Sequence, residues 1–247
     1  MRIGGAVVAD VRAAHNSCVH ASNEHELIEV LSDVIQGCDI ASWAASAVAT
    51  VAAAPSFEAV SGPYSAAARK LKETVLSSGD ARAARLDVLG AGSLAKHGTA
   101  CMFRALLLLV ACNSSDEGTR GSLVDRLFHT GDNEERIALL CTLAYLPEPK
   151  RYAATAVEAC RTNVLDVFVS IACDNDYPAS WFPDAAFNQM VMKALFSSVE
   201  LARIRGLSAR VNPELRRMAR DYAAERRAAG RSIPSDIALA IGEGLQS

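Results

Sequence analysis

Three polar side chains interrupt an apolar segment in a pattern that could support chemistry. The segment 183–197 carries Asn188, Gln189 and Lys193 among apolar residues on both sides of a predicted helix. A helix that is apolar on both sides is typical of a core, so these polar groups are expected to be partly buried. Gln189 and Lys193 are four residues apart and project together. They either complete a buried polar network or line a pocket for an oxygen-rich or anionic ligand, in which Lys193 would carry a proton.

A second candidate is the stretch FHTGDNEERIALL, residues 128–140, which combines a histidine, three acids and an arginine ahead of an apolar run. Asp132 and Glu135 have the spacing of a capping box, and acidic residues in a first helical turn favour the helix dipole. Capping therefore explains most of the motif and leaves His129 and Arg136 unexplained. Of these two, His129 could be a proton carrier in a site.

The junction EACRTN, residues 158–163, places an arginine close to the predicted start of an almost wholly apolar helix. Asn163 is expected to cap that helix. An arginine next to a helix N-terminus is suited to binding an anion. Arg161 could equally form a structural ion pair with Glu158, and the sequence leaves both interpretations open.

Two places in the sequence contain side chains that can bind metal ions. Asp174 and Asp176 in CDNDYP, residues 173–178, raise the question of a magnesium–diphosphate site, but the segment lacks an aspartate-rich helix motif and turn formation explains it. Near the N-terminus a group of histidines and a cysteine has no tetrahedral zinc spacing; it comprises His15, Cys18, His20 and His25. We predict no metal site, and the sequence does not indicate a cofactor.

The last predicted helix is rich in arginine, as are some DNA-binding surfaces. Acidic residues alternate with these arginines, and Leu215, Met218 and Tyr222 face inward, which favours a solvated helix face. The net charge of -3 gives no general attraction to nucleic acid or anionic lipid. We therefore predict no nucleic-acid partner. Common enzyme motifs such as GxSxG, a P-loop or HExxH are absent from the sequence, so catalysis stays open.

Composition favours a helical protein with a sizeable core. Hydrophobic residues make up 51% of the 247 residues and aromatic residues only 6%. Seven cysteines without CxxC spacing are typical of a reduced, cytoplasmic protein. The two longest apolar runs, 40–55 and 101–112, are shorter than the roughly 20 residues of a membrane span. No secretory signal and no transmembrane segment are expected.

The elements that must position these residues are predicted to be helices throughout. Antiparallel helix pairs joined by tight turns suggest an all-α fold, either an irregular HEAT-like α-solenoid or a helical bundle, in a single domain with residues 1–24 loosely ordered. Asn212, Pro213 and Gly230 mark the start and end of the last long helix. Residues 113–122 are expected to be a loop, and a Ser/Gly/Asp-rich stretch after residue 77 a surface loop or a break between halves. Helices are predicted at 23–37, 39–54, 63–77, 94–111, 132–146, 149–161, 164–173, 183–197 and 213–230.

Residues 94–237 resemble the EboA family. The resemblance is specific over RTNVLDVFVSIACDNDYPASWFPDAAFNQMVMKALF, residues 161–196, and over the tail GLSARVNPELRRMARDYAAERRAAGRSIP. The family motifs Arg-Thr-Asn, Asn-Pro-Tyr-Pro and Trp-Asn-Gln-Met correspond here to Arg161, Thr162 and Asn163, to Asn175, Tyr177 and Pro178, and to Asn188, Gln189 and Met190. This sequence departs from the motifs at Asp176, which replaces the first proline, and at Phe187, which replaces the tryptophan.

The resemblance implies an all-α bacterial protein encoded beside metabolic enzymes, among them proteins like a UbiA-type prenyltransferase and a dehydroquinate-synthase-like cyclase. It implies a role in making or exporting a small secondary metabolite, in some cyanobacteria a sunscreen pigment precursor. The departures at Asp176 and Phe187 indicate a divergent member of such a pathway, and they put a ligand common to the whole family in doubt.

Two functions follow as hypotheses. The first is a protein that binds or transforms a small oxygen-rich or anionic metabolite, which could be prenylated, in a pocket of the C-terminal half. Arg161, Asn163, Asn175, Asn188 and Gln189 would bind the ligand, Lys193 or His129 would carry a proton, and Tyr177 would donate one. The alternative is a non-catalytic helical scaffold that organises pathway enzymes near a membrane prenyltransferase, in which the same polar residues are structural.

Overall fold

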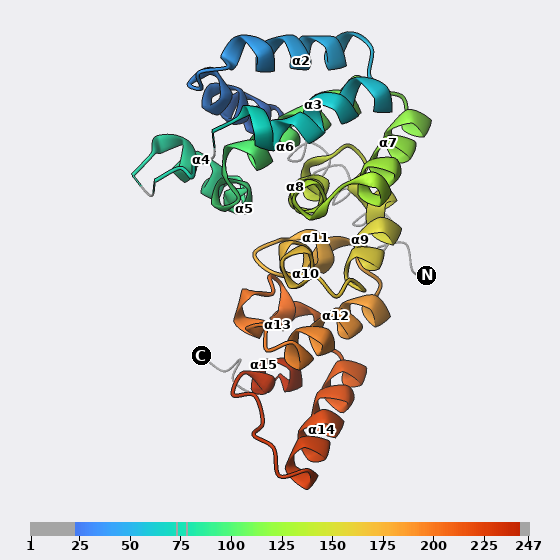
Figure 1. Cartoon of the computed structure of the whole chain (residues 1–247). Coiled ribbons are helices and arrows are strands. Elements are labelled where there is room, and N and C mark those ends of the chain that lie inside the picture. Colours follow the sequence, from blue (N-terminus) through green and yellow to red (C-terminus); the bar gives the residue numbers. More distant parts are fainter. Residues whose placement is uncertain (1–22, 73, 78, 243–247) are drawn as a thin grey trace, which may run out of the picture. The chain divides into compact units, whose positions relative to one another are not determined.

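The computed structural model describes residues 23–72, 74–77 and 79–242 (Figure 1). Every regular element among these residues is a helix, so the predicted all-α class is confirmed. The finer expectation of a HEAT-like solenoid or a bundle stays a prediction. None of the helices in the described part is long and apolar enough to cross a membrane.

The chain divides into two compact units, which are described separately. The N-terminal unit contains residues 23–123 and 145–147 of the described chain, and the C-terminal unit contains 124–144 and 148–242. Whether the two units fold together as the single domain expected from the sequence stays a prediction. The N-terminal unit comprises helical residues 23–36, α2 (Ala41–Ala53), α3 (Phe57–Lys70), α4 (Ala81–Val88), α5 (Gly92–Lys96) and α6 (Gly98–Asn113).

Helix α6 forms the core of the N-terminal unit. Its sequence is apolar on all sides, so it must be covered on all sides, and nearly all of its residues are buried. Helices α2, α3 and α5 pack against it, with α2 and α3 lying along it in Figure 1. Trp43 of α2 contacts Phe103 of α6 with ring centroids 5.1 Å apart. The one basic residue of α6, Arg104, is 2% exposed and donates from Nε to the carbonyl of Tyr64 over 3.0 Å.

In the C-terminal unit α10 lies at the centre, and α12 joins α10 to α14. Helices α8, α9, α11 and α12 contact α10, while α14 contacts α12 and α15. Asn188 of α12 pairs with Asn212 at the start of α14, and further along both helices Phe196 packs on Tyr222. Because the two contacts follow in the same order, α12 and α14 run in the same direction. Helix α7 (Glu117–Thr130) ends in this unit. The other helices here are α8 (Asn133–Thr142), α9 (Ala153–Ala159), α10 (Leu165–Ala172), α11 (Tyr177–Trp181), α12 (Asp184–Phe196), α13 (Leu207–Arg210), α14 (Pro213–Ala228) and α15 (Ile237–Ile241), with single 3-10 turns η1 (Leu143–Tyr145), η2 (Pro149–Tyr152) and η3 (Leu201–Arg203).

Four expectations in the first half of the chain were wrong. Helix α3 begins at Phe57 and contains Pro63, which was expected to open it, because Ser56 caps the helix through a bond from the Ala59 N–H. The stretch after residue 77 contains α4, which Asp80 caps. The segment 94–111 is not one helix, because the backbone changes direction at Gly98, where φ is +81°.

The fourth concerns the predicted loop at 113–122, where α7 already begins at Glu117. Asp116 accepts a hydrogen bond from the Thr119 N–H over 3.0 Å, which is the bond that an N-cap makes. Leu123, Val124 and Leu127 are buried along one face of the helix. The polar composition of the segment therefore belongs to the exposed first turns of an amphipathic helix.

Candidate functional site

Lys193 of α12 links three helices of the C-terminal unit. Its Nζ donates to the carbonyl of Cys160 over 2.6 Å and to that of Thr162, and it lies 4.8 Å from the centre of the Phe168 ring. Cys160 ends α9, so the ammonium group compensates the negative end of that helix. Two of its three N–H donors are taken up by the fold, and the third is left for another acceptor.

Asn188 is buried and pairs with a residue at the start of α14. Its Nδ2 donates to Asn212 Oδ1 over 3.0 Å, and Asn212 Nδ2 donates back to Asn188 Oδ1 over 2.9 Å. Asn212 is also the N-cap of α14, since its Oδ1 accepts from the Leu215 N–H. This confirms the predicted Asn-Pro start of that helix, and it gives Asn188 a structural role in holding the cap.

Replacing Asn188 by alanine is expected to lower the free energy of unfolding by about 1.5 kcal/mol, because the protein loses the two hydrogen bonds between the buried Asn188 amide and the half-buried Asn212 amide. A double-mutant cycle with Asn212→Ala should return a coupling energy of about 1 kcal/mol in urea unfolding. Gln189→Ala is the matched control and should change stability by less than about 0.5 kcal/mol. Equal losses from Asn188→Ala and Gln189→Ala would contradict the pairing.

Gln189 was expected to be partly buried, and it is exposed. It lies on the side of α12 that faces an open groove, together with Lys193. Gln189 and Lys193 therefore project together as expected, whereas Gln189 is not buried as expected. The reason is that only one face of α12 at this point packs against α14.

Asn175 and Tyr177 are both buried and hold the turn between α10 and α11. Asn175 Nδ2 donates to the carbonyls of Leu140 and Ser170, and its Oδ1 accepts from the Tyr177 N–H. The Tyr177 hydroxyl donates to the carbonyl of Pro149 over 2.6 Å. Burial raises the pKa of Tyr177 well above its ordinary value, so the phenol stays protonated. Both side chains thus act inside the fold.

Arg161 and Asn163 are exposed. The expectation that Asn163 caps α10 was wrong, because the N-cap is Val164. The Val164 N–H donates to the Thr162 hydroxyl oxygen over 3.1 Å. The Arg161 side chain makes no ion pair with Glu158 within the described residues. Glu158 instead lies 3.8 Å from Nδ1 of His129.

The stretch 128–140 consists of the end of α7 and the start of α8. Asp132 and Glu135 form the predicted capping box, with both reciprocal bonds present. Arg136 donates from Nε to the carbonyl of Phe128 over 2.9 Å and from Nη2 to that of His129, so it caps the C-terminus of α7. His129 is exposed beside Asp125, at 3.3 Å. This arrangement gives His129 no enclosed site.

The two acidic residues of the possible magnesium site, Asp174 and Asp176, each form an ion pair with an arginine. The Asp174 carboxylate lies 2.9 Å from Arg203, and the Asp176 carboxylate lies 2.9 Å from Arg205. Within the described ranges no three histidine, cysteine or acidic side chains gather as metal ligands. Three members of the N-terminal group of histidines and cysteine, His15, Cys18 and His20, lie outside the described residues.

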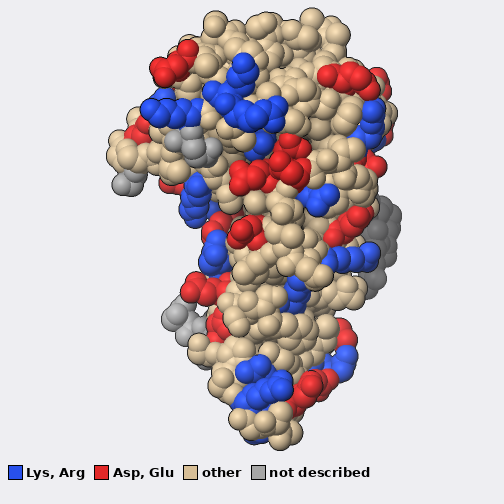
Figure 2. Space-filling model, viewed as in Figure 1, with Lys and Arg blue, Asp and Glu red and all other residues tan. Residues whose placement is uncertain are grey.

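A groove of about 380 Å³ lies between α12 and α14. It has an apolar floor and a polar rim on which Arg217 binds Glu214 and Asp221 and lowers the pKa of Glu214. Basic and acidic side chains lie next to one another over α14 (Figure 2). The Phe196 side chain, 61% exposed, packs edge-on against Tyr222 with ring centroids 4.8 Å apart. The lining residues are Gln189, Met192, Lys193 and Phe196 of α12, and Arg217, Met218, Asp221, Tyr222 and Glu225 of α14.

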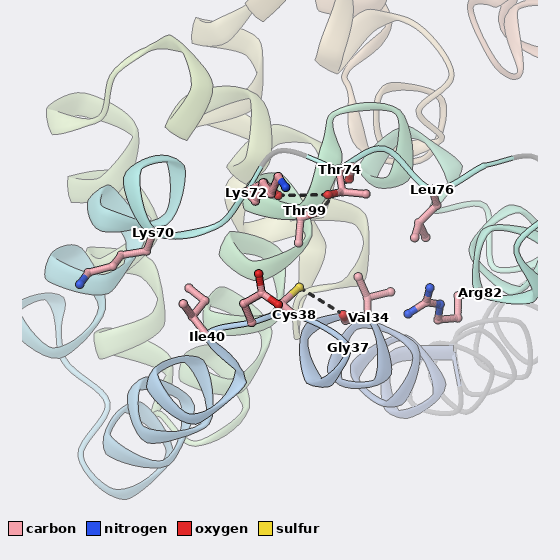
Figure 3. A pocket seen from close by; sticks show the side chains of 11 residues that line it. Val34, Gly37, Cys38, Ile40, Lys70, Lys72, Thr74, Leu76, Arg82 and Thr99 are labelled. Atoms are coloured by element: carbon pink, nitrogen blue, oxygen red, sulfur yellow. Dashed lines mark hydrogen bonds between the residues drawn. The ribbon is translucent and has the colours of Figure 1, made fainter.

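A second pocket, of about 340 Å³, lies in the N-terminal unit (Figure 3). Short segments from four places in the chain meet there, and no sequence motif connects them. The lining residues are Val34, Gly37, Cys38, Asp39, Ile40, Lys70, Lys72, Thr74, Leu76, Arg82 and Thr99.

The sequence model described as "Metabolite traffic protein EboA" matches residues 24–242. The chain belongs to the EboA family. The match extends beyond the resemblance noted in the second half of the sequence and includes the N-terminal unit from residue 24. No curated protein and no solved structure is significantly similar to the chain. In this EboA-family chain, the motif residues Asn175, Tyr177 and Asn188 bond within the fold, whereas Arg161, Asn163 and Gln189 are exposed.

Proposed function

We propose that this EboA-family chain serves a bacterial secondary-metabolite pathway by binding a small amphiphilic metabolite in the groove between α12 and α14. The observation that carries the proposal is the combination of an aromatic pair, Phe196 exposed and Tyr222 half-buried, with polar side chains in one groove. Phe196 and Tyr222 offer an apolar edge, while Gln189 and Lys193 line the same groove. The family description as a metabolite traffic protein supports a metabolite ligand.

The groove favours a ligand with an apolar body and an oxygen-rich head. Met192, Met218 and the two rings make a floor of flexible thioethers and aromatic faces, to which a prenyl chain or a planar ring can bind. The head group would accept a hydrogen bond from Lys193 and exchange bonds with the Gln189 amide. All three side-chain nitrogens of Arg217 already donate to Glu214 or Asp221, so we assign it no ligand contact.

Binding without chemical transformation is the form of this function that the geometry supports best. Tyr177 is fully buried with its hydroxyl bonded to Pro149, and His129 lies on an open surface. Lys193 donates two hydrogen bonds, to the carbonyls of Cys160 at the end of α9 and of Thr162 just before α10. To act as a proton carrier, Lys193 would have to give up these hydrogen bonds.

The proposal is tested by titrating the protein with a geranylated hydroxybenzoate and measuring the heat of binding. Phe196→Ala should weaken binding about tenfold, because it removes an aromatic contact worth about 1.4 kcal/mol. Phe196 is exposed, so its replacement should leave the fold intact, as checked by circular dichroism. Leu165→Ala is the matched control, since Leu165 is 51% exposed in the same unit and does not line the groove. Equal affinity of the parent and Phe196→Ala, or no binding to the folded parent, would refute the proposal.

A second candidate function is a scaffold that organises pathway enzymes. The hydrogen bonds of Asn175 and Asn188 to other groups of the fold favour it, because these amides then serve the fold. A scaffold should retain a pathway enzyme during affinity purification when no small molecule is present. Loss of the partner on extensive dialysis would argue for the ligand-dependent function instead.

A further inference from the structure

The pocket of the N-terminal unit is independent of the groove and has a different chemistry. Figure 3 shows Lys72, Thr74 and Thr99 on one side and Cys38 with Ile40 on the other, while Arg82 and Leu76 come from a third direction. Lys70 extends away from these side chains, so we assign it no role. The pocket volume of about 340 Å³ is at the lower end of the range for small-molecule sites, which is roughly 300–1,000 Å³, and so suits a compact ligand.

Two cations provide donors for an anionic group, while one exposed carboxylate, that of Asp39, also lines the pocket. Lys72 is exposed and belongs to the segment that follows α3. Arg82 binds Asp80 through Nε at 2.9 Å and Nη2 at 2.6 Å, which leaves its Nη1 edge unoccupied by that carboxylate. The Nη1 atom points to the floor of the pocket, since it lies 3.5 Å from the position that a Cβ on Gly37 would take. A larger residue at position 37 would narrow the space in front of this edge.

The threonine hydroxyl groups of the pocket already donate hydrogen bonds within the fold. Thr99 Oγ1 donates to the Thr74 carbonyl over 2.7 Å, Thr74 Oγ1 donates to the Lys72 carbonyl over 3.3 Å, and the Cys38 thiol donates to the Val34 carbonyl over 3.5 Å. The two hydroxyl oxygens can therefore only accept further hydrogen bonds. A ligand that satisfies them must carry hydroxyl or amine donors of its own.

We propose that this pocket binds a small hydroxylated anion, with its carboxylate or phosphate group at Lys72 and the Nη1 edge of Arg82. The hydroxyl groups of the ligand donate to Thr74 and Thr99, and its carbon skeleton contacts the apolar wall. That wall consists of Val34, Ile40 and Leu76. The site lies in the other unit and takes a smaller, more polar ligand than the groove between α12 and α14, so it goes beyond the proposed function.

Cys38 supplies a reporter at the floor of the pocket. It is half-buried, whereas the other five cysteines in the described part of the chain are buried. Burial raises the pKa of the Cys38 thiol, and Arg82 offsets this only in part, so alkylation should be slow at neutral pH and measurable at mildly alkaline pH. Peptide mapping by mass spectrometry then reads modification at Cys38 alone.

The experiment measures alkylation of Cys38 by iodoacetamide in the full chain, with gluconate, glucose phosphate or inorganic phosphate as the probe. At least one of the two hydroxylated anions should slow alkylation in a saturable way. Comparing gluconate with glucose phosphate tells which anionic group the site prefers, and phosphate alone should bind more weakly. Lys72→Met should weaken protection about tenfold, which corresponds to one charge-assisted hydrogen bond.

Arg69→Met is the matched control, because Arg69 is an exposed basic residue at the end of α3 that does not line the pocket. Calorimetric titration detects a ligand that binds without covering Cys38. Absence of both protection and heat with all three probes would overturn the proposal, as would equal affinity of the parent and Lys72→Met. Phe196→Ala should leave protection unchanged, which separates this test from that of the proposed function.

Discussion

Replacing Asn175 by alanine is expected to lower the free energy of unfolding by about 3 kcal/mol, roughly 1 kcal/mol for each of three buried hydrogen bonds. The residue is 6% exposed. Its amide nitrogen lies 3.2 Å from the Leu140 carbonyl and 3.0 Å from that of Ser170, and its oxygen lies 2.9 Å from the Tyr177 nitrogen. Alanine can replace none of these contacts, so groups on α8, α10 and α11 lose a shared partner.

Urea unfolding followed by circular dichroism provides the measurement. Asn163→Ala is the control, because Asn163 is also a family-motif asparagine but is exposed, and its loss should change stability by less than about 0.5 kcal/mol. If both variants unfold at the same urea concentration as the parent, the three bonds of Asn175 contribute no net stability. A ligand-binding role for Asn175 would then regain support.

Local signals in the sequence were sufficient to predict the boundaries of helices that begin or end with strong caps. Asn212, Pro213 and Gly230 predicted α14, and the structure has the Asn212 side chain bonded to the Leu215 N–H and a positive φ of 66° at Gly230. Asp132 and Glu135 predicted the start of α8 in the same way. Each signal acts within about four residues, so it depends little on the rest of the fold.

The wrong boundaries arose where one local rule outweighed another. Pro63 was expected at the first turn of a helix, but the cap at Ser56 starts α3 earlier and the helix continues through the proline. At α7 the polar composition suggested a loop, although Asp116 was available as a cap. The burial of Leu123 and Leu127 stabilises that helix, and their burial follows from tertiary packing that composition does not encode.

The candidate sites show even more clearly that local sequence patterns do not determine tertiary packing. Asn188 and Gln189 are neighbours in the sequence, yet one is 2% exposed and bonded to Asn212 while the other borders a groove. Adjacent helical residues point about 100° apart, so the elements packed against α12 decide which of the two is covered. The pocket around Cys38 depends on four separated segments meeting, and no spacing in the sequence indicates that.

The buried arginine of α6 gives the last prediction. Arg104→Ala is expected to lower the free energy of unfolding by about 3 kcal/mol, because it leaves a cavity beside Tyr64 in a closely packed core. Arg104→Met keeps most of the volume and removes a charge whose burial is costly, so it should stay within about 1 kcal/mol of the parent protein. In a Trp181→Phe background, which removes the tryptophan of the other unit, the fluorescence of Trp43, which packs on Phe103, can follow unfolding of this unit in urea. If Arg104→Met destabilises the protein as much as Arg104→Ala does, the hydrogen bond and ring contact of Arg104 with Tyr64 outweigh the cost of burying the guanidinium group. Arg104 then stabilises the packing of α6 against α3.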